Sequence, residues 1–238
     1  MEVFNRFSML FSTPSEAFRG LNEKPLSGMN ISAGFFTAVF ATLVFSYWSA
    51  SDPVLMQETI NNRMVEIDRQ VAEKKITVET SVELKKKVAA EIEVNGNIWA
   101  SIGYTLNFML IFFISSFYYY IIGSLAGSNG KFSFFSSMSM ISILSFLVAI
   151  KVIVSNALQI ALGNLHSSMG IVLLISNFNQ ENWLHQLFSS LDVFTVAYYY
   201  FLIVGFKTGA KTSWMVAIST VMIPYLLILS FSLYSSIR

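Results

Sequence analysis

The chain has 238 residues, of which 54% are hydrophobic and only 12% are charged, and its formal net charge is +1. A composition this apolar lies far from that of soluble domains and indicates a protein of the lipid bilayer. The charges form no clustered basic face of the kind that binds nucleic acid. Cysteine is absent, which excludes disulfides and thiolate metal sites.

Residues 1–28 predict an N-terminal amphipathic segment at the membrane interface. Its apolar residues recur at helical spacing and would form one stripe, made of Val3, Phe4, Phe7, Leu10 and Phe11. Thr13-Pro14 then begins a second helix, which Pro25 ends. We interpret the segment as an interfacial anchor, with a partner-binding motif as the alternative.

Residues 29–51 predict the first transmembrane helix, with an uncharged apolar run over Met29–Tyr47 and Trp48 at the interface. The following region, residues 52–97, contains most of the charged residues of the chain. Its first half carries apolar side chains at steps of three and four, which form the seam of Met56, Ile60, Met64, Ile67 and Val71.

A second helix within residues 52–97 is predicted to start at the capping pattern Thr80-Ser81-Val82-Glu83. Its apolar face, formed by Leu84, Val88 and Ile92, suggests that the two helices pair as a hairpin that stands off the membrane. Asn95-Gly96-Asn97 is expected to break or bend the helix before the next span.

Residues 98–238 predict a region of four further transmembrane helices. The apolar runs, each near the ~20 residues that cross a bilayer, are Ile98 to about Gly123, a run after Lys131 to about Ser155, Leu187–Phe206, and Ser213–Ser235. The apolar stretch Gly170–Ile175 is too short to cross and is either re-entrant or interfacial. The predicted fold is therefore an all-α integral membrane protein with five transmembrane helices and an extramembrane helical hairpin between the first two.

The distribution of lysines predicts the orientation. Lys131, Lys207 and Lys211 lie in the tight connections on the side of the N-terminus, whereas the loop between the third and fourth spans has no Lys or Arg. Basic residues in short loops favour the cytoplasmic side. We therefore expect a cytoplasmic N-terminus and an extracytoplasmic hairpin.

Two charged residues at membrane depth are the strongest candidate site residues. Lys151 lies toward the outer end of the third span and Asp192 near the outer end of the fourth, so the two can meet as an ion pair. The pair would either tie two helices together or belong to a transport or proton-relay site. Asn107 and Asn156 are expected to donate hydrogen bonds between helices, and Ser136, Ser139 and Ser142 to form a closely packed arc.

A metal site is a weaker hypothesis. Glu181 and His185 are spaced i, i+4 and could share an ion with His166. The chain contains no nucleophile elbow, phosphate-binding loop or His-Glu-x-x-His motif. We therefore assign no catalytic, cofactor-binding or metal residues and expect a protein that is not an enzyme.

Three short motifs resemble the Yip family of Ypt/Rab-interacting membrane proteins, specifically its bacterial branch. They are the opening helix Thr13-Pro14-Ser15-Glu16-Ala17-Phe18 before Pro25, the glycine turn with Lys131-Phe132, and Leu191-Asp192-Val193-Phe194 leading to Gly205 and Ser213. Residues 52–97 look like an insertion. The resemblance implies a five-span bundle in a bacterial inner membrane, without catalytic activity, that acts in membrane organisation or transport.

Two functions follow from these observations. The first is a non-enzymatic scaffold or accessory subunit whose hairpin recruits a protein partner or a second copy through the seam Met56, Ile60, Met64, Ile67 and Val71. The alternative is a transporter or channel component that uses Lys151, Asp192 and other polar residues of the third and fourth spans.

Overall fold

The computed structural model describes residues 2–127, 132–165, 170 and 182–237. Within these residues the chain is helical and forms no β-strand, apart from a single isolated bridge between Gly170 and Asp192. The helices, in chain order, are α1 Glu2–Met9, α2 Pro14–Phe18, α3 Gly28–Ala50, α4 Pro53–Ala72, α5 Val78–Ala126, α6 Phe134–Leu162, α7 Trp183–Ser190, α8 Val193–Gly209 and α9 Trp214–Ile237.

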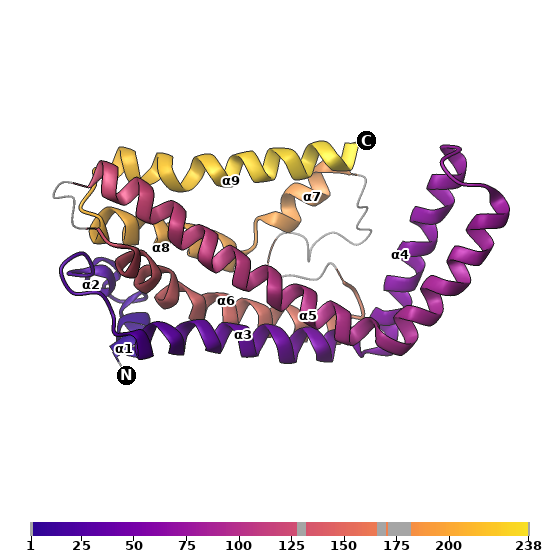
Figure 1. Ribbon diagram of the computed structural model, residues 1–238, viewed down its shortest axis with the longest axis horizontal. Helices are drawn as coiled ribbons and strands as arrows, with labels where there is room; N and C mark the ends of the chain where they lie inside the picture. Colours follow the sequence, from indigo (N-terminus) through magenta and orange to yellow (C-terminus); the bar gives the residue numbers. More distant parts are fainter. Residues whose placement is uncertain (1, 128–131, 166–169, 171–181, 238) are drawn as a thin grey trace.

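Four of the described helices, α3, α5, α6 and α9, are long and apolar enough to cross a membrane. The apolar helix α8 is shorter, at 17 residues, and runs alongside them (Figure 1). The all-α membrane architecture expected from the composition is therefore confirmed.

The bundle has two distinct ends. Figure 1 shows α1, α2 and the turn between α8 and α9 at one end, and α4 with the first part of α5 at the other. At the first end, Lys211 Nζ lies 2.7 Å from Glu23 Oε1, and Lys207 Nζ lies 5.3 Å from the centre of the Trp214 ring. We call these the N-terminal end and the hairpin end.

The most extensive helix pair is α3 with α6, and small residues make it close. Gly34 of α3 lies against the carbonyl and hydroxyl oxygens of Ser142 of α6. Ser142 Oγ donates to the carbonyl oxygen of Ile31 at 2.8 Å, and Ser139 Oγ accepts from the Leu26 amide at 2.9 Å. The predicted arc of Ser136, Ser139 and Ser142 is buried, and Ser139 and Ser142 make the interhelical bonds for which small hydroxyl residues are used in lipid, whereas Ser136 bonds with Ser133 in the cap of α6.

The N-terminal segment packs on the bundle instead of lying free at the interface. Val3 and Leu10 are fully buried, and the Phe4 ring lies 4.6 Å from the Phe146 ring of α6. Arg6 Nη1 donates to the carbonyl oxygens of Ala17 and Arg19 and so holds α1 against α2. One side of the stripe thus packs on the bundle while Phe4 and Phe11 are exposed, and its position at the membrane interface stays a prediction.

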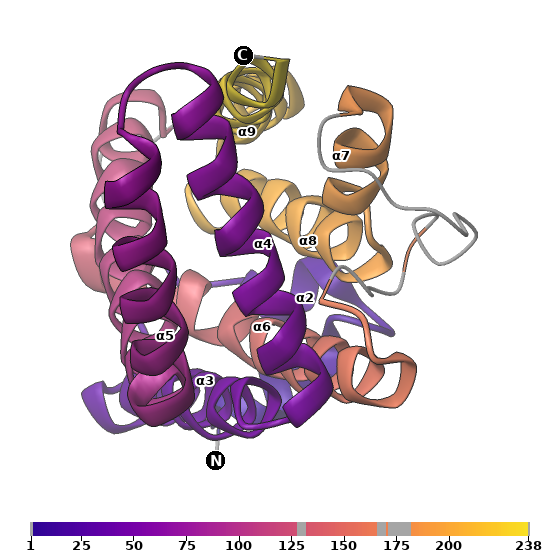
Figure 2. The same ribbon diagram turned by 90° about the vertical axis from the view of Figure 1, so that its right-hand side faces the viewer.

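Helix α4 runs back along the first part of α5. Figure 2 shows them side by side in front of the bundle, and Lys85 Nζ of α5 lies 2.6 Å from Asp68 Oδ1 of α4. Two residues of the predicted seam, Ile60 and Ile67, are buried within the chain, while Met56, Met64 and Val71 are half-buried. The seam is therefore largely occupied by contacts inside the chain.

The pair of α4 and the first part of α5 lies across the end of the bundle (Figure 1). Glu58 Oε2 of α4 accepts from the Leu165 amide at 2.8 Å, and Leu165 also accepts from Gln159 Nε2 of α6 at 2.7 Å. These bonds join the base of α4 to the end of α6. The pair therefore lies crosswise at the end of the bundle, and its position relative to the membrane stays a prediction.

Several predicted helix ends were wrong. Helix α5 begins after the N-cap Thr77, three residues before the predicted cap at Thr80, and it continues through Asn95-Gly96-Asn97 as one helix. Its path bends between the hairpin end and the bundle (Figure 1). The glycine and asparagines therefore bend the helix without breaking it, since its backbone hydrogen bonds are kept.

The predicted fourth span, Leu187–Phe206, is divided in the structure. Helix α7 ends at Ser190, and α8 starts at Val193. Asp192 is the N-cap of α8, where its Oδ1 accepts from the Thr195 amide at 2.9 Å. A carboxylate in this position satisfies a backbone donor at the helix start, so the helix begins there and not at Leu187.

The contact between α3 and α6 gives a first prediction. A Cβ atom at position 34 would overlap the oxygens of Ser142, so Gly34→Ala should lower the free energy of unfolding in detergent by about 1–3 kcal/mol, as overpacking does. Gly103→Ala on α5 is the matched control, because a Cβ there meets no atom within 4 Å. Equal stability of the two variants in denaturant titrations would contradict the close contact.

Candidate functional site

A large cavity lies between α3, α5, α6 and α8 and extends beneath α4. Its volume is about 1380 Å³. Trp99 and Ser115 of α5 both line it, and at 1.5 Å per residue they are about 24 Å apart along the helix. The cavity therefore reaches from the hairpin end deep into the bundle.

The wall of the cavity is polar on α3 and α6. Its hydroxyl and amide groups follow helical spacing: they are Thr42, Ser46 and Ser49 on α3, and Ser145, Ser155, Asn156 and Gln159 on α6. The wall on α5 and α8 is mainly aromatic, with Trp99, Tyr104, Phe108, Phe112, Phe194, Tyr198 and Tyr199. A mixed lining of this kind suits a ligand that has both polar and apolar parts.

Packed rings close the cavity toward the N-terminal end. The ring centres of Phe35 and Phe112 lie 4.8 Å apart, and the Phe206 ring lies 5.6 Å from Tyr119 and 6.1 Å from Phe132. All five side chains are buried. Among the described residues, the lining of the cavity reaches α4 and the first part of α5 at the hairpin end, and packed rings lie at its other end.

The structure brings together the two predicted site residues, Lys151 and Asp192. Lys151 Nζ lies 2.7 Å from Asp192 Oδ2 and donates to Thr195 Oγ1 at 2.6 Å, and Thr195 Oγ1 in turn donates to Asp192 Oδ2 at 2.7 Å. Asp192 is only 2% exposed, whereas the Lys151 side chain is 38% exposed and lines the cavity. The pair thus ties α6 to the start of α8 and places a cation at the cavity wall.

The backbone around Asp192 explains its position. Asp192 lies in the break between α7 and α8, and its bridge partner Gly170 comes so close that a Cβ on Gly170 would lie 3.1 Å from Asp192 Cα. The remaining residues of the predicted re-entrant stretch, 171–175, lie outside the described residues.

The two predicted asparagines both line the cavity. Asn156 Nδ2 donates to the carbonyl oxygen of Val152, at 2.8 Å, within its own helix. The expected bond from Asn156 to another helix is therefore wrong, because the nearest acceptor lies one turn back along α6. Asn107 contributes its amide to the α5 wall.

From the sequence, Lys151, Asp192 and Asn156 are expected to line a polar cavity in the transport alternative, but the hydroxyl residues and Gln159 of the wall are not predicted. The spacing of these residues in the sequence could have indicated the wall. Ser145, Ser155 and Gln159 lie on one face of α6, and Thr42, Ser46 and Ser49 lie on one face of α3. The cavity residues Arg63, Glu66 and Gln70 of α4 were also missed. Nothing in their spacing shows that α4 folds over the end of the bundle, because that depends on the contact between Glu58 and Leu165.

Of the three residues in the metal hypothesis, only His185 lies within the described residues, on α7; His166 and Glu181 lie outside them. In the described part of the chain, no three acidic or histidine side chains come together as metal ligands.

Comparisons of the chain with protein-family models, with curated proteins and with solved structures gave no match. The resemblance to the Yip family stays a prediction from the sequence motifs.

The ion pair gives a second prediction. Lys151→Met should lower stability by roughly 1–3 kcal/mol, because Asp192 is left buried with an unpaired charge. Adding Asp192→Asn should recover most of that loss, since asparagine keeps the N-cap bond without the charge. Unfolding of the single and double variants in detergent measures the coupling. Purely additive losses would show that the pair contributes no coupling.

Proposed function

We propose that this protein is a transporter or channel component that takes its solute into the cavity from the hairpin end. The observation that supports the proposal most strongly is the Lys151–Asp192 pair on the wall of a cavity about 1380 Å³ in volume. Charged residues are costly at membrane depth and commonly mark a solute or ion pathway. The hydroxyl and amide groups of α3 and α6 extend the same polar surface.

The proposed topology has five spans: in addition to α3, α5, α6 and α9, the membrane is crossed by α8. Its 17 residues extend about 26 Å, close to the ~30 Å of a bilayer core. Lys207 and Lys211 at the N-terminal end favour the cytoplasm for that end. The α4–α5 pair then lies outside the cytoplasm, as an extramembrane hairpin.

The shape of the cavity fits an alternating-access cycle. Its described lining reaches the hairpin end, and the packed rings of Phe35, Phe112 and Phe206 lie toward the other end. Transporters that work in this way expose their site to one side of the membrane at a time. We propose that the described conformation is the outward-open one.

A cysteine-labelling experiment tests the open cavity, since the chain has no cysteine of its own. In phosphatidylglycerol vesicles, Asn107→Cys should react with a membrane-impermeant maleimide, because the thiolate forms only in water. Leu106→Cys is the matched control: its neighbouring position is exposed but does not line the cavity, so it should face lipid and stay unreacted. Equal reactivity at positions 106 and 107, or none at 107, would contradict the open cavity.

Flux through reconstituted vesicles tests the function directly. A panel of small cations, carboxylates, sugars and fluorescent lipid analogues should include a solute that the native chain moves and the Lys151→Met/Asp192→Asn variant does not. The double variant is used because it is expected to remain folded. Transport no faster than in empty vesicles for every solute would end this proposal.

The scaffold function remains the second candidate, supported by the exposed outer side of the hairpin. Because Ile60 and Ile67 are buried, a partner would contact exposed residues such as Val65, Val78 and Val82 instead of the seam. A protein that co-purifies with the full chain and is lost on deletion of residues 53–94 would favour this function over transport.

A further inference from the structure

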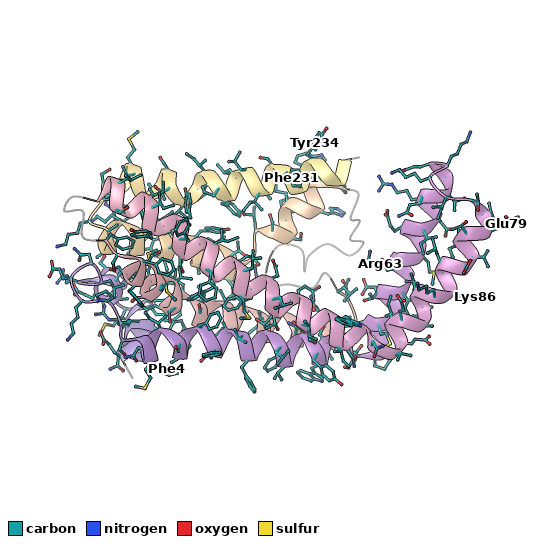
Figure 3. The ribbon with its side chains drawn as sticks, viewed as in Figure 1. Phe4, Arg63, Glu79, Lys86, Phe231 and Tyr234 are labelled. Carbon is teal, nitrogen blue, oxygen red and sulfur yellow. The ribbon has the colours of Figure 1, made fainter. Side chains whose placement is uncertain are left out.

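The mouth of the cavity carries one cation and two carboxylates. Arg63, Glu66 and Glu91 line the cavity where α4 crosses the end of the bundle. Figure 3 shows Arg63 on the side of α4 that faces the bundle, whereas Lys86 and Glu79 lie on the far side of the hairpin. The three residues also surround a second, smaller cavity of about 360 Å³ between α4 and α5.

The cation at this mouth, Arg63, is exposed on α4. Within the described part of the chain, Arg63 forms no ion pair. Glu66 accepts a hydrogen bond from Gln70 at 3.4 Å, and Glu91 lies 4.0 Å from Lys87, the longest ion pair in the structure's described residues. The mouth therefore offers a guanidinium for an anion and carboxylates for a cation.

A lateral opening of the cavity is inferred from the exposure of three of its α5 residues. Helix α5 is bonded to α9 through Tyr118, whose hydroxyl donates to the Thr220 carbonyl at 3.0 Å, and the two helices diverge toward the hairpin end (Figure 1). Three α5 residues that line the cavity are also exposed: Trp99 by 68%, Tyr104 by 62% and Ile111 by 49%. In a bilayer this opening faces lipid chains, so an amphiphile could enter without leaving the membrane.

We propose that the cavity binds a phospholipid with a phosphoethanolamine headgroup. The phosphate is placed against Arg63, because guanidinium groups bind phosphate oxygens with charge-assisted hydrogen bonds. The ammonium is placed against Glu66 and Glu91, and an acyl chain runs along the aromatic wall of α5. The cavity volume exceeds the ~300–1000 Å³ of pockets for drug-sized ligands, as a lipid requires.

In this arrangement Glu91 lies eight residues, about 12 Å along α5, beyond Trp99 and therefore on the headgroup side of it. Trp99, an interfacial residue type, marks the membrane surface on α5, and α4 begins directly after the first span. The proposal rests on the proposed function, because it names the class of solute for the same cavity.

Protection of the Asn107→Cys thiol tests the proposal in the full chain. In phosphatidylglycerol vesicles, whose lipid has the phosphate but no ammonium, the thiol should be open to maleimide. Adding dioleoylphosphatidylethanolamine should slow its labelling by about tenfold, the effect of one charge-assisted contact between the ammonium and the carboxylates. Arg63→Gln should abolish the protection. Arg69→Gln is the matched control, because Arg69 is paired with Glu73 at 3.1 Å within the hairpin and should leave the protection unchanged.

A second variant separates headgroup recognition from folding. Glu66→Gln should reduce the preference for the ethanolamine lipid and leave the labelling rate in phosphatidylglycerol vesicles as it was. Equal labelling rates with and without the ethanolamine lipid, or equal protection in the Arg63 and Arg69 variants, would overturn the proposal. Full protection by free phosphoethanolamine at the same concentration would also overturn it, in favour of a water-soluble ligand.

The two levels of the account fail in different ways. If the thiol reacts in phosphatidylglycerol vesicles but the ethanolamine lipid gives no protection, the lipid proposal is wrong and the open cavity stands. If the thiol is unreactive in phosphatidylglycerol vesicles, the open cavity itself is wrong and the lipid proposal falls with it.

Discussion

The close approach of α3 and α6 determines how the other helices are arranged. Gly34 allows the two backbones to approach, and Ser139 and Ser142 join them by hydrogen bonds to backbone groups of residues 26 and 31. In lipid no hydrophobic driving force holds helices together, so small residues and interhelical hydrogen bonds decide which helices pair. Helix α5 packs against both α3 and α6, and the cavity lies between α5 and α8.

The polar residues of α6 and α8 meet at the wall of this cavity. In contact with lipid, their unpaired charges would cost free energy. Lys151 and Asp192 satisfy each other, and Thr195 completes the network. The same pair joins α8 to α6, and its lysine lines the cavity. It can therefore stabilise the bundle and also contact a solute. A tie placed at a cavity wall can be broken and remade by a solute, whereas a tie in a packed interior cannot.

The sequence predicts the helices well and their arrangement poorly. Apolar runs identify α3, α5, α6 and α9, because length and hydropathy are local properties. The Lys151–Asp192 contact was also predictable, since both charges lie near the same end of neighbouring spans. The sequence did not predict that the run Leu187–Phe206 is divided at Asp192. In an apolar sequence, a polar residue that caps a helix cannot be told from a polar residue inside one.

The cavity was harder to predict, for two physical reasons. Its polar wall is spread over α3 and α6, and serines on a transmembrane helix can equally pack tightly, as Ser139 and Ser142 do. Its mouth depends on α4 lying across the bundle, which follows from the bond between Glu58 and the Leu165 amide, 107 residues apart. Contacts this distant in the sequence leave no periodic signal.

The account depends most on α8 crossing the membrane, because only then do the hairpin and the α8–α9 turn lie on opposite sides. Single cysteines at the exposed positions Val65 and Ser213, labelled with an impermeant reagent from each side of intact vesicles, measure this directly. The account predicts that the two positions react from opposite sides. Reaction of both from the same side would show that α8 does not span the bilayer and would contradict the five-span bundle and its cavity.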